Sequence, residues 1–342
     1  MAQVTLSDVA RAAGVSLATA SRALSGAAGR TVRPELAGRV LAAARTLNYS
    51  PNASAQAMVR GATDTVGLIV HDIADPFAAA VASGVMAAAG ERELIVTVAS
   101  TLWDPEAEIR HVAAMRRQRV RVVILAGSRF ADEATTLRLA VEVAGITEAG
   151  GRVASIGQPV LPVPALVLDN SGGARRLART LWSLGYRRFA VLAGPETVLT
   201  SEDRLAGFRA GLADCGHRLS PSAIIGAQLT RDGGYVAMTE LLSREIAVDV
   251  VFAVNDVMAV GGMAALRDQG YQVPGDLAVA GFDDIPTLRD IVPPLTTVRM
   301  PLAAMGRRIL ELALADHDPA EAPLTAMPTG EVVIRASTPP RP

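Results

Sequence analysis

The 342-residue sequence contains no lysine, so all 33 of its basic side chains are arginines. It also contains a single cysteine, which excludes an internal disulfide and fits a reducing compartment. Hydrophobic residues make up 50% of the chain, but no apolar run reaches the ~18 residues that span a bilayer. The first residues lack the basic segment, apolar core and cleavage site of a secretion signal. We therefore expect a cytoplasmic protein with no membrane partner.

Common signatures of enzymes and metal sites are missing as well. The sequence has no G-x-G-x-x-G, P-loop, G-x-S-x-G or zinc-ligand spacing, and its four histidines are scattered along the chain. We therefore expect no catalytic residue, no metal and no cofactor. An enzyme remains an alternative that no motif favours.

The net charge of −1 conceals an asymmetry between the two ends of the chain. Residues 1–60 carry seven arginines against Asp8 and Glu35, a net charge of +5, so the remainder carries −6. A small basic segment on an acidic body indicates that the segment alone meets a polyanion such as DNA.

Three short helices are predicted in the basic segment, over residues 5–13, 17–24 and 34–47. Thr5 and Asp8 have the spacing of a capping box, and Ser16 is a good N-cap for the second helix. Gly14 between the first two helices suits a left-handed turn. Two helices joined by a tight glycine-containing turn are typical of a helix-turn-helix unit.

Beyond Gly61, short apolar runs alternate with helical stretches. This alternation predicts buried parallel strands with helices between them, and nine strand signals favour two α/β halves over one sheet. The predicted strands are 66–70, 94–99, 120–127, 152–157, 165–170, 189–194, 223–228, 250–255 and 277–284, and the predicted helices are 77–92, 105–118, 172–184, 202–215, 234–244 and 256–269.

Polar side chains gather just after these strands, where parallel sheets place their ligands. They suit a hydroxyl-rich ligand, but they equally suit simple capping of the next helix. The residues are Asp72, Ser100, Ser128, Gln158, Asp169, Asn255, Asp256, Asp283 and Asp284.

The chain resembles the LacI/GalR (lac-repressor) family of bacterial transcriptional regulators over nearly its whole length. The resemblance rests on TLSDVARAAGVSLATASRAL, NYSPNASAQAMVRG, TVGLIVHDIADPF, RLAGF, VNDVMAVGGMAALRDQGYQVPGDLAVAGFDDIP and PPLTTVRMP, in this order. It implies an all-α helix-turn-helix N-terminal domain and an α/β two-lobed, periplasmic-binding-protein-like (type I) effector domain. The expected bounds are 1–49 for the helix-turn-helix domain, 50–61 for a hinge helix and 62–342 for the effector domain, with a first lobe of about 62–167 and 297–327 and a second of about 168–296 and 328–342.

The resemblance also implies which residues contact double-stranded operator DNA. Ser16, Leu17, Ala18, Ser21 and Arg22 match the start and exposed face of the recognition helix. Leu17 and Ala18 can touch a thymine methyl, whereas Arg22 can bind guanine or a phosphate. Thr5, Thr19, Ser21, Arg30 and Asn48 are expected at phosphates. In the hinge, Met58 stands where the family usually has a minor-groove leucine, with Asn52, Ala53 and Ala57 on the same side.

The effector is expected between the lobes. Asp72, Asp75 and Phe77 match the family's first-strand motif, Arg204 its effector-contacting arginine, and Asn255 and Asp283 its hydroxyl-binding positions. Two departures are Gly157, where many relatives have aspartate, and Leu229, where an aromatic residue often stacks on the ligand. Trp103 is a candidate replacement for that aromatic residue, and an Arg204–Asp283 structural pair is the competing interpretation of those two residues.

We therefore expect a homodimeric or tetrameric repressor of carbohydrate-utilisation genes, released from its operator by a sugar or related polyol. The alternative within the family is a regulator that responds to a nucleobase or another metabolite as co-repressor. A stand-alone sugar-binding protein would not need the helix-turn-helix segment. We also expect the 300–314 segment to form an amphipathic helix that packs near the first lobe.

Overall fold

The computed structural model describes residues 4–25, 32–49, 62–316 and 322–341. The chain divides into two compact units, residues 1–63 and 64–342. Five residues predicted to bind DNA lie outside the described residues, together with the predicted hinge at 50–61: Arg30, Asn52, Ala53, Ala57 and Met58. The domain bounds expected from the sequence stay a prediction.

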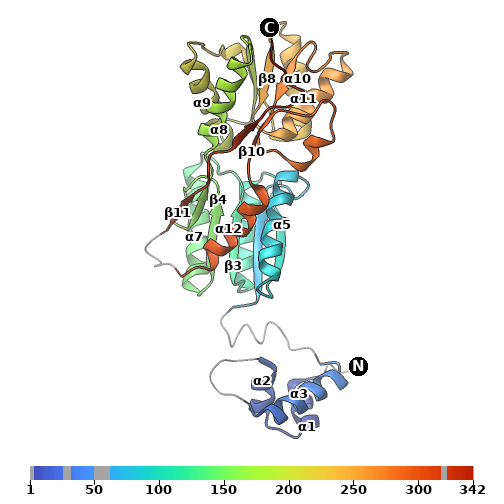
Figure 1. Cartoon of the computed structure of the whole chain (residues 1–342). Coiled ribbons are helices and arrows are strands. Elements are labelled where there is room, and N and C mark those ends of the chain that lie inside the picture. The colour runs from blue at the N-terminus through green and yellow to red at the C-terminus, as the bar shows by residue number, and fades with distance from the viewer. Residues whose placement is uncertain (1–3, 26–31, 50–61, 317–321, 342) are drawn as a thin grey trace. The chain divides into compact units, whose positions relative to one another are not determined.

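The first unit contains three helices, α1 (Leu6–Ala13), α2 (Leu17–Ser25) and α3 (Pro34–Thr46) (Figure 1). The Thr5 hydroxyl and Asp8 form the predicted capping box at the start of α1. Gly14 has a φ of 61°, the left-handed conformation predicted for the turn. The helices enclose a small core that includes Val9, Ala20 and Val40, all fully buried.

A six-stranded parallel sheet forms the first lobe of the second unit. Its strand order is β11-β5-β4-β3-β1-β2, so the chain reverses its direction of sheet growth between β1 and β3. The strands are β1 (Thr65–Val70), β2 (Ile95–Ser100), β3 (Val122–Ala126), β4 (Arg152–Ile156), β5 (Ala165–Val167) and β11 (Leu324–Ala326).

Helices cover both faces of this sheet. The contacts place α5 (Pro76–Gly90) and α12 (Leu302–Leu314) on one face, and α6 (Pro105–Arg117) and α7 (Glu133–Glu148) on the other. Strand β1 shows why: Leu68 packs into the core that includes α5 and α12, whereas Ile69 packs into the core that includes α6 and α7. The 300–314 segment therefore packs on the first lobe, as predicted, and most of its apolar side chains are buried there.

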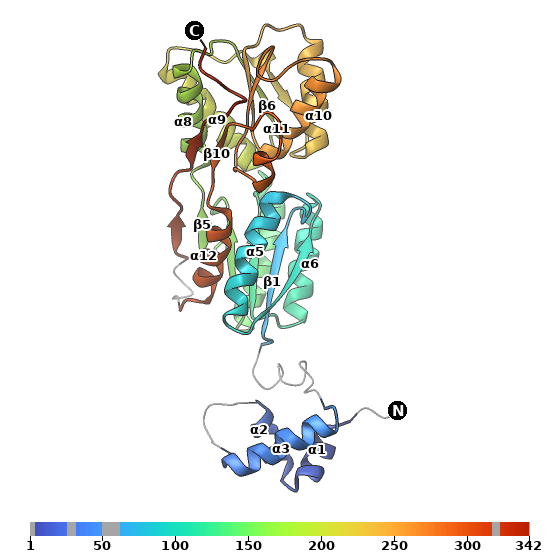
Figure 2. The same cartoon turned by 45° about the vertical axis from the view of Figure 1, so that its right-hand side comes forward.

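A four-stranded parallel sheet of order β7-β6-β8-β9 forms the second lobe. Figures 1 and 2 show α8 and α9 together on one side of this lobe and α10 and α11 on the other. The elements are α8 (Asn170–Ser183), β6 (Phe189–Ala193), α9 (Leu199–Asp214), the short helix η1 (Pro221–Ala223), β7 (Ile224–Gly226), α10 (Arg231–Ser243), β8 (Val250–Ala253), α11 (Asp256–Asp268), β9 (Ala278–Ala280) and the short helix η2 (Pro286–Arg289).

Three short strands and one helix were not predicted from the sequence. The antiparallel pair β10 (Thr297–Arg299) and β12 (Glu331–Val333) lies where the chain passes between the lobes, and β11 extends the edge of the first sheet (Figure 2). The missed helix is α7. All nine predicted strands, the nine helices given by residue range and the helix at 300–314 are present with small shifts at their ends, while the predicted hinge helix lies outside the described residues. The expected two α/β halves are confirmed.

Candidate functional site

A cavity lies between the two lobes, beyond the carboxyl ends of their central strands. In the first lobe its walls include His71 and Asp72 after β1, and Gly127 and Ser128 after β3. These two strands flank the point where the direction of sheet growth reverses, which is the usual position of ligands in such sheets. The second lobe has the same strand order, and Asn255 lines the cavity just after β8.

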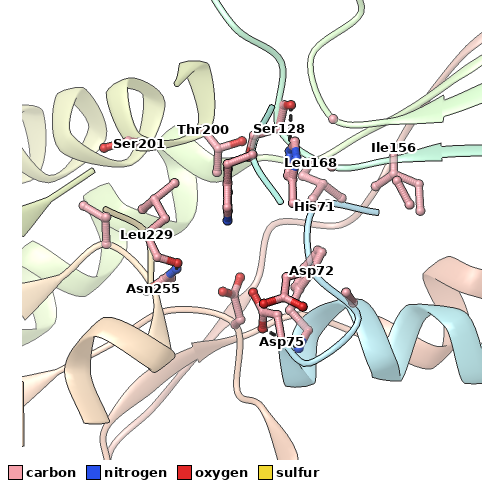
Figure 3. A pocket seen from close by; sticks show the side chains of 18 of the residues that line it. His71, Asp72, Asp75, Ser128, Ile156, Leu168, Thr200, Ser201, Leu229 and Asn255 are labelled. Atoms are coloured by element: carbon pink, nitrogen blue, oxygen red, sulfur yellow. Dashed lines mark hydrogen bonds between the residues drawn. The ribbon is translucent and has the colours of Figure 1, made fainter. Parts of the chain in front are cut away.

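All seven residues predicted to bind an effector line this one cavity. Four come from the first lobe and three from the second, although up to 211 positions separate them in the sequence. They are Asp72, Asp75, Phe77, Trp103, Arg204, Asn255 and Asp283, and Figure 3 shows their region of the cavity. The cavity therefore brings the predicted set together, while ligand binding by these residues stays a prediction.

Arg204 on α9 and Asp283 after β9 form a buried ion pair in the second lobe. Two bonds of 2.7 and 3.3 Å join the guanidinium to the carboxylate, and both side chains are about 95% buried. Arg204 also donates to Asn170 Oδ1 at 2.9 Å and to the Val254 carbonyl oxygen at 2.8 Å. Burial raises the pKa of Asp283 and the arginine opposes this. The structural pair weighed from the sequence is formed, and it leaves both groups on the cavity wall.

Asp283 is held in an unusual backbone conformation, with a φ of 120°. Residues other than glycine adopt such angles only at a cost, and they are found most often at functional sites. The Asp283 amide donates to the Val298 carbonyl oxygen, and its own carbonyl accepts from the Met300 amide. Contacts with the β10 region therefore fix the carboxylate on the cavity wall.

Asp75 is both a helix cap and a cavity residue. Its Oδ1 accepts a hydrogen bond of 2.9 Å from the Phe77 amide at the start of α5. Burial raises its pKa to about 6, and the charges of Asp283 and Asp72 act in the same direction. Asn255 behaves similarly, because it caps α11 through the Met258 amide and also lines the cavity. Both residues therefore cap helices and also line the cavity, while their contact with a ligand stays a prediction.

Trp103 and His71 form a stacked pair at one side of the cavity. Their ring centroids are 4.0 Å apart with planes inclined by 13°. His71 is fixed by hydrogen bonds of 3.3 Å to Thr101 Oγ1 and 3.0 Å to the Ser128 carbonyl oxygen. Burial, with the nearby Arg129 charge, lowers the pKa of His71 to about 3, so its ring is neutral. His71 positions the indole without adding charge to the cavity.

Gln158 connects the two lobes at the edge of the cavity. Its amide nitrogen donates to Asp203 Oδ2 at 2.8 Å and to Thr200 Oγ1 at 3.1 Å, both on α9. Its amide oxygen accepts from the Arg129 backbone nitrogen at 3.3 Å in the first lobe. A backbone bond of 3.0 Å from Leu199 to Arg129 joins the same two segments. Polar contacts therefore join the two lobes at this edge of the cavity.

Several cavity residues were missed from the sequence. His71 directly precedes Asp72 at the end of β1, so the expectation that ligands bind just beyond the strand ends could have identified it. Thr200 and Ser201 begin α9 one turn before Arg204, and only their position in the fold places them in the cavity. The two departures from the family pattern, Gly157 and Leu229, also line the cavity.

Other strand-end side chains have structural roles. Asp169 caps α8 through the Gly172 amide, and Asp284 pairs with Arg299 and Arg335. Asp256 accepts from Thr297 Oγ1 and the Ile285 amide while fully buried, and burial raises its pKa. The structure separates these groups from the cavity residues, which the sequence could not do.

In the first unit, the predicted base-reading side chains share one exposed face of α2. Ser16, Leu17, Ala18, Ser21 and Arg22 are exposed, and Leu17 keeps 51% of its surface accessible. Ser16 Oγ accepts from the Thr19 amide at 3.2 Å and so caps the helix as predicted. Thr19 is half-buried, while Thr5 and Asn48 are exposed.

Metal-binding clusters and membrane-spanning helices are both absent from residues 4–25, 32–49, 62–316 and 322–341. These residues contain no group of three or more histidine, cysteine or acidic side chains suited to a metal ion. None of their helices combines the length and apolar character needed to cross a membrane.

Comparison with known proteins identifies the family. The family described as bacterial regulatory proteins, lacI family, matches residues 5–52, and the periplasmic binding protein-like domain matches residues 178–338. The transcriptional regulator GalS of Salmonella typhimurium is 35% identical over 311 residues, covering 91% of this chain and 89% of that protein. The chain belongs to the LacI family. As a member of this family it is a DNA-binding transcriptional regulator.

Solved structures of other members match the LacI-family chain over nearly its whole length. The CelR–cellobiose complex has a TM-score of 0.70 and 30% identity, covering 98% of this chain and all of that one. The lac repressor dimer bound to operator and the anti-inducer ONPF has a TM-score of 0.82 and 26% identity, covering 98% and 99%. These LacI-family relatives are transcriptional regulators, which are not enzymes.

Proposed function

We propose that this protein is a cytoplasmic, dimeric repressor whose operator binding is released by a sugar-like effector held between its lobes. The observation that carries the proposal is the cavity, which collects all seven predicted effector residues from both lobes. Carboxylates, an amide and an arginine fork are the groups that pair with hydroxyls. The cellobiose bound to CelR is consistent with an effector of this class.

The operator would be read by the exposed face of α2. Leu17 and Ala18 are suited to thymine methyl groups, and Arg22 to a guanine edge or a phosphate. One such short helix makes few contacts, whereas a two-fold dimer doubles them and fixes the spacing of two half-sites. The lac repressor structure, a dimer on its operator, supports this arrangement.

Effector binding would act by favouring one relative position of the lobes. The contacts of Gln158 with Thr200 and Asp203 are of the kind that such a change would exchange. A coupling free energy of about 1–3 kcal/mol between effector and operator is typical of allosteric proteins. We infer that the protein has no catalytic role.

The test uses the full-length protein and an operator selected from random DNA. A panel of sugars and nucleobases is added, and operator affinity is measured by fluorescence anisotropy. A sugar that weakens operator binding by about 5- to 150-fold supports the proposal. A nucleobase that strengthens it, or a panel with no effect, contradicts it.

Trp103→Ala should weaken the sugar response by at least ten-fold, because the indole lines the cavity. Leu102→Ala is the matched control, since Leu102 is 70% exposed and does not line it. Asp283 is a poor choice for this test, because removing it would leave Arg204 charged and buried, at a cost of about 3–5 kcal/mol in stability.

A further inference from the structure

The arginines that line the cavity region are already paired. A groove adjoins the cavity and shares part of its wall. Among the described residues that line either space, the arginines are Arg204 and Arg231. Arg204 pairs with Asp283 at 2.7 Å and Arg231 pairs with Asp232 at 2.8 Å. The charge of Arg204 is buried against Asp283, whereas Arg231 is exposed and has the Asp232 carboxylate beside it.

Two further carboxylates line both the cavity and the groove without such a partner. Asp72 and Asp75 form no ion pair within the described part of the chain, and each receives one backbone hydrogen bond of 2.9 Å, from Ala74 and Phe77 respectively. Figure 3 shows both side chains on one side of the cavity, and their charges interact. The region therefore carries two uncompensated negative charges.

An aromatic ring lies beside these carboxylates. Trp103 lines both the cavity and the groove, and His71 covers one of its faces. The side chain is half-buried, and its accessible part is available to a ligand in these spaces. Tryptophan is the aromatic side chain that attracts cations most strongly, and the neutral His71 beneath it adds no opposing charge.

We infer that the effector is a cationic polyol, such as an amino sugar, whose protonated amine contacts Asp72, Asp75 and the Trp103 ring. This inference rests on the proposed function and adds the charge of the effector to it. The remaining hydroxyls would meet Asn255, the Arg204–Asp283 pair and the hydroxyl groups at the start of α9. Charge-assisted hydrogen bonds to the amine are about twice as strong as those from a neutral hydroxyl.

Anionic effectors are disfavoured by the same groups. A sugar phosphate would place its charge near Asp72 and Asp75, with no unpaired arginine in the described lining and no lysine anywhere in the sequence. A neutral sugar could accept and donate hydrogen bonds but would leave the two negative charges uncompensated.

The test is isothermal titration of the full-length protein with matched ligands. For the gluco, galacto and manno series, the amine, the neutral parent, the N-acetylated amine and the 6-phosphate are compared at pH 7.5. The buffer is HEPES, because Tris is itself an amino polyol. In one series the amine should bind about ten-fold tighter than the parent and the N-acetyl form, and the phosphate should not bind.

Two variants make the result specific to the carboxylates. The double variant Asp72→Asn, Asp75→Asn keeps an N-cap at α5 but removes both charges, so it should bind amine and parent equally. The control Asp268→Asn removes a surface carboxylate that lines neither the cavity nor the groove, and the preference for the amine should persist.

The outcomes separate the two proposals. A neutral parent that binds as well as its amine, or a phosphate that binds best, overturns the cationic effector. An amine preference that survives in the double variant overturns the contact of the amine with Asp72 and Asp75. Each of these results leaves the proposed function standing. If no ligand binds and none alters the operator complex, both proposals fail.

Discussion

Asp75 illustrates at the residue scale how one side chain serves both the fold and the site. Capping α5 requires a short side chain with an acceptor oxygen, and the position after β1 then places the same carboxylate in the cavity. Capping alone would be served equally well by asparagine. The charge is therefore not needed for the helix, and its burial near Asp72 and Asp283 has an energetic cost.

The raised pKa of Asp75 makes the stability of the protein depend on pH. The pKa of Asp75 is about 6 in the folded protein, against 3.8 as the ordinary value, so folding favours the protonated form. This stabilisation is complete below pH 3.8 and is lost as pH rises through 6. Asp75→Asn has no such loss, so its melting temperature relative to the wild type should increase between pH 4 and pH 7.

Calorimetric scans of both proteins at several pH values would measure this difference. The groups facing Asp75 are Asp72, Asp283 and Arg204, with the neutral His71 on the same cavity wall. The pKa of His71 is lowered from 6.5 to about 3, so its contribution to the stability of the protein is lost as pH falls below 6.5, the opposite direction to that of Asp75. Because both proteins contain His71, this contribution cancels when their melting temperatures are compared. A difference independent of pH would contradict the raised pKa of Asp75.

At the scale of elements, the contact between α5 and α12 depends on two glycines. A Cβ on Gly84 would lie 2.0 Å from the Ala303 carbonyl oxygen, and one on Gly306 would lie 2.1 Å from that of Val81. The two helix backbones therefore approach more closely than alanine would allow. This contact attaches a helix from the C-terminal part of the chain to the first lobe.

Gly84→Ala should destabilise the protein by about 1–3 kcal/mol, because the methyl group has no space unless the helices move apart. Gly90→Ala, at the last residue of the same helix, meets no atom within 4 Å and should be neutral or stabilising by up to about 1 kcal/mol. Urea unfolding of both variants measures the contrast. Equal effects would show that the close approach does not limit packing here.

Element prediction from the sequence succeeded where apolar runs were long and failed where they were not. Strands β10, β11 and β12 contain threonine, arginine or glutamate instead of a continuous apolar run, and their pairing depends on distant parts of the chain. The missed helix α7 contains several β-branched residues, which lower helix propensity, and its apolar side chains are not confined to one narrow stripe. Contacts with distant segments therefore determine the structure of both the three short strands and α7.

At the scale of the whole molecule, operator affinity should depend steeply on salt. The plot of log affinity against log salt concentration has a negative slope, and its magnitude decreases by about one for each phosphate that a variant no longer neutralises. Arg22→Gln in a dimer removes two arginines from the exposed face of α2. If Arg22 contacts phosphate, the slope should fall by about two with unchanged sequence preference.

If Arg22 reads guanine instead, one base pair per half-site should lose about 1–3 kcal/mol of discrimination while the slope changes less. Selection from random DNA with the variant and the wild type distinguishes the two results. Arg267→Gln is the control, because Arg267 pairs with Asp268 on the surface of the second lobe. A flat salt response of the wild type would contradict DNA binding through phosphates.

The sequence by itself determined most of the elements, the helix-turn-helix and the two α/β halves, and its resemblance to the LacI family led to seven of the residues that line the cavity. Apolar periodicity and strand-end positions are local properties, so they can be seen in the chain directly. Only the tertiary structure decided which polar groups neutralise one another. Arg204 meets Asp283, Asp284 meets Arg299 and Arg335, and Asp72 and Asp75 meet no arginine among the described residues, because ion pairing depends on distances between segments far apart in sequence.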